Sequence, residues 1–125
     1  MDRFNERWHE PNQHPNWLSS GKDYPKRADH HAQRNRAIAR HPGPTFSCAH
    51  MANDGEDLAE FGRWLDAHPN KYVDIDARIN ERVRQSYVAR RFLLKYQDRV
   101  MFGAESAPDR AVFRVDCQFL GTYDE

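Results

Sequence analysis

The chain has 125 residues, and its 19 lysines and arginines balance its 19 aspartates and glutamates. This length suits one domain with a modest core, and a net charge of zero argues against a general nucleic-acid binder, which needs a cationic face to displace counterions. Hydrophobic residues make up 38% of the chain, whereas about 45–50% is usual for a globular domain when glycine is counted. We therefore expect a chain that buries only a limited core by itself.

The cysteines and the hydropathy pattern indicate where in the cell the protein is located. Cys48 and Cys117 lie far apart in the chain, which is typical of reduced cysteines in a cytoplasmic protein. No apolar stretch approaches the roughly 20 residues that span a bilayer, and charged residues follow Met1 where a signal peptide would be apolar. The sequence predicts a cytoplasmic location, with neither a membrane nor a nucleic acid as partner.

Residues 1–27 are predicted to form an irregular N-terminal segment, separate from an α/β portion over 28–125. Prolines are frequent in this segment, and each removes a backbone donor and disfavours helix in the residue before it. We expect at most one helical turn near its start. Trp8 and Trp17 are expected to cover apolar surface.

The rest of the chain is predicted to alternate helices with short strands. The expected elements are a helix at 27–41, a strand at 45–50, a helix at 56–67, a strand at 71–76, a helix at 86–97, a strand at 99–103 and a helix at 109–120. Asp54 is expected to cap the second helix, and residues 77–85 show no clear period. Each strand and the helix after it have the length of one βα unit, which favours a parallel sheet with right-handed crossovers.

Each predicted strand ends near a polar residue able to do chemistry. The first ends at His50, the second at Asp74, and the third leads through Gly103 to Glu105. Functional groups of parallel α/β folds lie at the carboxyl ends of the strands. We therefore expect His50, Asp74 and Glu105 to share one rim, with Asp76 on the same face as Asp74 because side chains alternate along a strand.

Three segments carry a resemblance to a known family, namely PTFSCAHMAN, LDAHPNKYVDIDARI and ARRFLLKYQDRVMFGAES. Together with NERWHE, HPNW and RNRAIARHP, they resemble the amidohydrolase-related metal-dependent hydrolases, in the branch that includes aminocarboxymuconate-semialdehyde decarboxylase. The resemblance implies a (β/α)8 barrel with a divalent metal, most often zinc, at its top. This chain would supply about three parallel βα units of that barrel, strands six to eight.

The resemblance also implies roles for individual residues. His50 falls at the strand-six histidine of the family, which binds metal or orients the attacking water, so it is the candidate catalytic residue and a candidate metal ligand. Glu105 falls at the metal-binding aspartate of strand eight. Asp74 and Arg78 are candidates for binding a polar small-molecule substrate. The alternatives are a hydrogen-bonded histidine at a strand end, a solvent-facing glutamate and structural ion pairs.

The chain departs from the family at several points. Gly103-Ala104-Glu105 stands where the family has Gly-Thr-Asp, and Val83-Arg84-Gln85-Ser86 where it has Gly-Arg-Gln-Pro. The family's His-x-His and strand-five histidine would lie upstream of Met1. We therefore predict a truncated member with impaired or no independent activity. The alternatives are a non-catalytic interaction module, a self-associating homo-oligomer and a gene fragment with no selected role.

Overall fold

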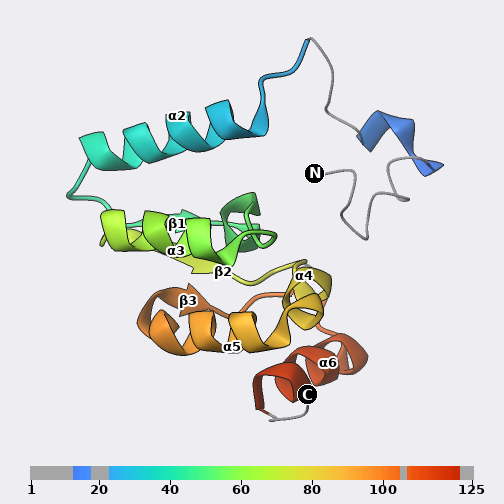
Figure 1. Cartoon of the computed structure of the whole chain (residues 1–125). Helices are drawn as coiled ribbons and strands as arrows, with labels where there is room; N and C mark the ends of the chain where they lie inside the picture. Colours follow the sequence, from blue (N-terminus) through green and yellow to red (C-terminus); the bar gives the residue numbers. More distant parts are fainter. Residues whose placement is uncertain (1–12, 18–22, 105–106, 122–125) are drawn as a thin grey trace. The chain divides into compact units, whose positions relative to one another are not determined.

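The computed structural model describes residues 13–17, 23–104 and 107–121 (Figure 1). The chain divides into two compact units, Met1–His41 and Pro42–Glu125, and each is described by itself. None of the described helices combines the length and the apolar character that a bilayer span requires.

The first unit contains a short 3-10 helix, η2 (Pro15–Trp17), and the helix α2 (Arg27–Arg40). The prediction of a helix over 27–41 is confirmed. The chain leaves α2 at His41, whose backbone N–H bonds the carbonyl of Ile38, and the following Pro42 cannot continue the helix. Ile38 is the buried residue of α2. Trp8, expected to cover apolar surface, lies outside the described residues.

The second unit alternates strands with helices, as the spacing of the apolar runs predicts. Its elements are β1 (Phe46–Cys48), η3 (His50–Asn53), α3 (Leu58–Ala67), β2 (Lys71–Asp74), α4 (Ile79–Arg84), α5 (Ser86–Lys95), η4 (Gln97–Arg99), β3 (Val100–Met101) and α6 (Arg110–Gly121).

The three strands form one parallel sheet in the order β1-β2-β3. Phe46 is in register with Lys71, and Val73 is in register with Val100. The predicted parallel pairing is therefore confirmed, and the fold is α/β with a three-stranded sheet. Since neighbouring parallel strands end on the same side, the residues that follow β1, β2 and β3 are brought to one edge.

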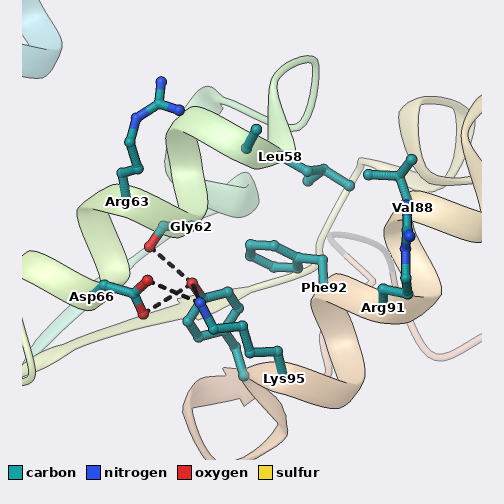
Figure 2. A pocket seen from close by; sticks show the side chains of 10 residues that line it. Leu58, Gly62, Arg63, Asp66, Val88, Arg91, Phe92 and Lys95 are labelled. Carbon is teal, nitrogen blue, oxygen red and sulfur yellow. Dashed lines mark hydrogen bonds and ion pairs between the residues drawn. The ribbon is translucent and has the colours of Figure 1, made fainter.

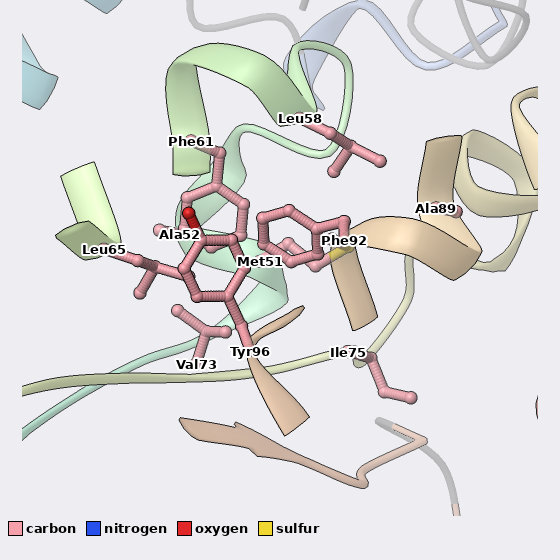
Figure 3. Close-up of a cluster of buried hydrophobic side chains, with 10 residues drawn as sticks. All are labelled: Met51, Ala52, Leu58, Phe61, Leu65, Val73, Ile75, Ala89, Phe92 and Tyr96. Carbon is pink, nitrogen blue, oxygen red and sulfur yellow. The ribbon is translucent and has the colours of Figure 1, made fainter. Parts of the chain in front are cut away.

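The core lies between one face of the sheet and the helices α3 and α5 (Figure 3). Val73 and Ile75 alternate with polar residues along β2 and its extension, and both are buried. Phe61 of α3 stacks on Phe92 of α5 with ring centroids 5.1 Å apart, and Phe92 packs on Tyr96 at 4.8 Å. Aromatic pairs at these distances add to the stabilisation that burial of their area provides.

The structure corrects two local expectations. Helix α3 begins at Leu58, and its cap is Asp57, whose side chain accepts from the N–H of Glu60 at 2.8 Å. Asp54 is instead a buried residue three positions before that cap. On α5, Ala89 and Phe92 are buried, whereas Val88 is 40% exposed.

Helix α4 has no counterpart among the predicted elements. Its buried residues are Glu81 and Arg82, so its inward face is charged and carries no apolar period for sequence analysis to detect. Arg82 forms an ion pair with Asp116 of α6, and its guanidinium lies 5.3 Å from the ring centre of Phe119. The buried charges of α4 thus connect it to α6.

Candidate functional site

His50, Asp74 and Asp76 meet at the carboxyl edge of the sheet. One potential ligand atom from each residue lies within 4.8 Å of the others, and all three residues are partly buried. His50 follows β1, Asp74 ends β2, and Asp76 lies two residues further on. The prediction that His50 and Asp74 share a rim is confirmed for this pair. We call the three residues the strand-end cluster.

Asp74 connects the ends of the first two strands. Its Oδ1 accepts the backbone N–H of His50 at 2.7 Å and that of Asp76 at 3.3 Å. A carboxylate that accepts backbone N–H groups at a strand end fixes the path of both chains. These bonds use one oxygen, which leaves Oδ2 of Asp74 for a further ligand.

The segment that carries His50 has an unusual backbone. The φ values are 56°, 51°, 56° and 57° at His50, Met51, Ala52 and Asn53. These four residues have left-handed backbone conformation, and we call them the left-handed turn. Left-handed conformation costs about 1–2 kcal/mol per residue outside glycine. Met51 and Ala52 are 0% and 2% exposed and belong to the core cluster, so their burial offsets part of this cost.

Arg78 contacts both ends of the left-handed turn. Its Nε donates to the carbonyl of His50 at 3.2 Å, and its Nη2 donates to Oδ1 of Asn53 at 2.6 Å. Its Nη1 pairs with Oε1 of Glu81 at 2.9 Å. The guanidinium is therefore engaged on three nitrogens within the protein. Its predicted role in substrate binding stays a prediction, and so does that of Asp74.

Gly103 brings the third strand end against the cluster. A Cβ atom at this position would lie 1.9 Å from Oδ1 of Asp76, which no side chain allows, so the carboxylate of Asp76 packs directly on the Gly103 backbone. Glu105 lies outside the described residues, and its predicted role as a metal ligand stays a prediction.

Sequence analysis missed part of this site. It placed Asp76 on the face of Asp74 from the two-residue alternation, yet gave it no ligand role. It assigned no site role to Asn53, whose partner Arg78 lies 25 residues away and leaves no local pattern, or to Glu81, which pairs with Arg78 three residues before it.

The donor set of the strand-end cluster suits a divalent cation. An imidazole nitrogen with two carboxylates is a combination that Zn²⁺ and Mn²⁺ accept, and three protein ligands with an open position are typical of catalytic zinc. Two carboxylates held this close repel each other, and a divalent cation between them would reverse that repulsion. The residues present therefore fit a metal.

A groove between α3 and α5 is a second concave feature (Figure 2). Its volume is about 310 Å³, and it is lined by Leu58, Ala59, Gly62, Arg63, Asp66, Val88, Arg91, Phe92, Lys95 and Tyr96. Lys95 donates to Oδ2 of Asp66 at 2.9 Å and to the Tyr96 hydroxyl at 2.7 Å. That hydroxyl lies 3.0 Å from both the Gly62 carbonyl and Oδ1 of Asp66.

The contacts between Asp66 and Lys95 in this groove shift the pKa values of both residues. Hydrogen bonds from Lys95 and Tyr96 lower the pKa of Asp66, and hydrogen bonds to Tyr96 and Asp66 raise the pKa of Lys95. Both side chains are more than half exposed, and their polar contacts are made with each other. The groove contains no residue of the strand-end cluster, so we take the cluster as the candidate site.

Comparison of the chain with protein-family models, curated proteins and solved structures finds no match. No family is therefore shown for this chain, and the resemblance stated from its sequence stays a prediction.

Proposed function

We propose that this chain is a metal-binding relative of the amidohydrolase-related hydrolases and decarboxylases, with impaired or no independent activity. The observation that carries the proposal is the meeting of His50, Asp74 and Asp76 at adjacent ends of parallel strands. Metal centres of parallel α/β enzymes lie at this edge, and the imidazole and carboxylates are ligands of the right kind.

The arrangement of the strands supports the family part of the proposal. Three parallel strands follow one another in both sequence and space, with a helix between each pair, as consecutive units of a (β/α)8 barrel would. We propose that they correspond to strands six to eight of such a barrel. The placement of His50 after the first of them agrees with the histidine that the resemblance assigns to strand six.

In this proposal the residues of the cluster have two roles, which are to bind a cation and to accept a proton. Asp74 and Asp76 supply negative charge, and His50 supplies a nitrogen that either binds the cation or accepts a proton from the attacking water. When bound, a divalent metal polarises a substrate carbonyl or carboxyl group and makes water nucleophilic near neutral pH. The substrate class is a small molecule with such a group.

The sequence departures support the impaired activity. Glu105 replaces the aspartate of the Gly-Thr-Asp motif, and one added methylene moves a carboxylate by about 1 Å, a shift to which catalysis is sensitive. We include a cytoplasmic location in the proposal because Cys48 and Cys117 are both free thiols.

Metal binding by the full chain tests this proposal. We expect isothermal titration with Zn²⁺ or Mn²⁺ to give one site per chain, lost in His50→Ala and weakened in Asp76→Asn. His30→Ala is the matched control, since His30 is exposed on α2. A wild-type chain that binds no metal, or a His50→Ala variant that binds as the wild type does, would contradict the proposal.

A second candidate function is a self-associating interaction module. Ser47 is exposed and Met101 is 39% exposed, and by alternation both lie on the sheet face away from α3 and α5. Parallel sheets are normally covered on both faces. A concentration-dependent dimer in light scattering, abolished by Met101→Glu, would favour this function, and a monomer with one cooperative thermal transition would count against it.

A further inference from the structure

The left-handed turn carries His50 into the strand-end cluster, and its shape decides where the imidazole lies. Four successive residues with positive φ form this turn, which begins two residues after the end of β1. If His50–Asn53 took an ordinary right-handed turn, the side chain of His50 would leave a different side of the backbone. Whatever holds the turn therefore also holds the ligand.

Two anchors hold the turn at its start. Asp74 accepts the N–H of His50 at 2.7 Å, and Arg78 donates to the carbonyl of the same residue at 3.2 Å. The peptide groups on both sides of the His50 Cα are thus fixed by side chains from β2 and the loop after it.

The same guanidinium also anchors the far end of the turn. Arg78 Nη2 donates to Oδ1 of Asn53 at 2.6 Å. A planar fork with donors at fixed angles can hold two points of a turn at a set separation, which the single flexible donor of a lysine cannot do.

The guanidinium of Arg78 is itself oriented by Glu81. Its Nη1 pairs with Glu81, whose side chain is 0% exposed at the start of α4. A buried carboxylate needs a charged or hydrogen-bonding partner, so the pair fixes the direction of the guanidinium. Gln85, at the end of α4, donates to the carbonyl of Gly55 at 2.7 Å and joins the same helix to the loop beyond the turn.

We infer that Arg78 is a positioning residue that holds the left-handed turn in the shape that places His50 beside Asp74 and Asp76, with Glu81 orienting its guanidinium. Arg78 acts through the backbone of His50, because its side chain donates to the His50 carbonyl, to Asn53 and to Glu81, and none of these acceptors is a ligand atom of the cluster. The consequence for metal affinity rests on the proposed function, whereas the consequence for the shape of the turn does not.

Two readouts on the full chain test this inference. Backbone chemical shifts and three-bond H–N–H–α couplings of residues 50–53, measured without metal, report the positive φ values. Zinc titration reports the affinity of the cluster. The variants are Arg78→Gln, Arg78→Lys and Glu81→Gln, with Arg114→Gln as control because Arg114 is exposed on α6.

We expect Arg78→Gln to lose the left-handed signature at residues 50–53 and to weaken zinc binding by about 10–100-fold, the range found when residues that orient metal ligands are changed. Arg78→Lys should keep the charge without restoring the signature, and Glu81→Gln should give an intermediate loss. Arg114→Gln should match the wild type in both readouts.

Signals of residues 50–53 that stay as in the wild type in both Arg78 variants would overturn the inference. So would an Arg78→Lys variant that restores both readouts in full, since a point charge would then suffice. If Arg78→Gln does not fold, Arg78→Lys and Glu81→Gln decide by the same criteria. A wild-type chain without zinc affinity would end the proposed function, while the backbone signals would still decide the role of Arg78.

Discussion

The apolar core and the carboxyl edge of the sheet are held together by different kinds of contact. Between the sheet and α3 and α5, the contacts are apolar and redundant, with Phe61, Phe92 and Tyr96 packed ring against ring. At the carboxyl edge, the strand-end cluster depends on single polar contacts and on a left-handed turn. The first region stabilises the fold. The second stores strain where the ligands are.

This contrast has a physical meaning. Strained backbone and close carboxylates persist only where the surrounding structure holds them, and they cluster at functional sites. Met51 and Ala52 belong to both regions, because they lie in the strained turn and are buried in the apolar cluster. The burial of these two side chains in the core therefore offsets part of the conformational cost of the turn that carries His50.

The largest expected effect comes from breaking the apolar region alone. Phe61 is fully buried, so Phe61→Ala should lower the free energy of unfolding by about 3–5 kcal/mol, measured by urea denaturation. Leu94→Ala, at a residue 55% exposed on α5, should change it by less than about 0.5 kcal/mol. Similar losses in the two variants would show that α3 and α5 do not form the core.

The next effect comes from the buried ion pair of Arg82 and Asp116, which joins α4 to α6. Asp116→Ala should cost about 3 kcal/mol in unfolding free energy, because it leaves a buried guanidinium uncompensated. The double variant Arg82→Met with Asp116→Leu should recover most of this loss. A double variant as unstable as the single one would mean that the loss does not come from the uncompensated guanidinium.

A smaller effect on stability, with a clear effect on the cluster, is expected from Gly103→Ala. The new methyl group would overlap the carboxylate of Asp76, so we expect zinc affinity to fall about 10-fold or more in a chain that still folds cooperatively. Gly43→Ala is the matched control, since nothing lies within 4 Å of a Cβ there. Equal zinc affinity in both variants would mean that the end of the third strand does not contribute to the site.

The smallest effect concerns the exposed pair of Asp66 and Lys95. Because Lys95 and Tyr96 lower the pKa of Asp66, its contribution to stability is present above the unfolded pKa of about 4 and is lost as the pH falls through the folded value. Asp66→Asn should therefore lower the thermal midpoint slightly at pH 7 and leave it unchanged near pH 2. The same small difference at both pH values would contradict this assignment.

Sequence analysis predicted the fold well where apolar residues recur with a period. The helix at 56–67 and the strand at 71–76 match α3 and β2 within two residues at each end, because a buried face repeats along each element. It failed at α4, whose inward residues Glu81 and Arg82 are charged. Arg82 pairs with Asp116, 34 residues further along the chain, and no local apolar pattern predicts that its side chain is buried.

The same division holds for the candidate site. The meeting of His50 and Asp74 follows from parallel strands, a topological rule that sequence spacing can invoke. The left-handed turn does not, since His50, Met51 and Ala52 have no intrinsic preference for positive φ. Its shape depends on tertiary contacts with Asp74 and Arg78, which are known only once the fold is known.

X-ray absorption spectroscopy of the zinc-loaded full chain decides whether the strand-end cluster binds a metal. We expect a shell of nitrogen and oxygen at about 2.0–2.1 Å, with the outer scattering of one imidazole that disappears in His50→Ala. A shell containing sulfur at about 2.3 Å, or several imidazoles that persist in His50→Ala, would contradict it.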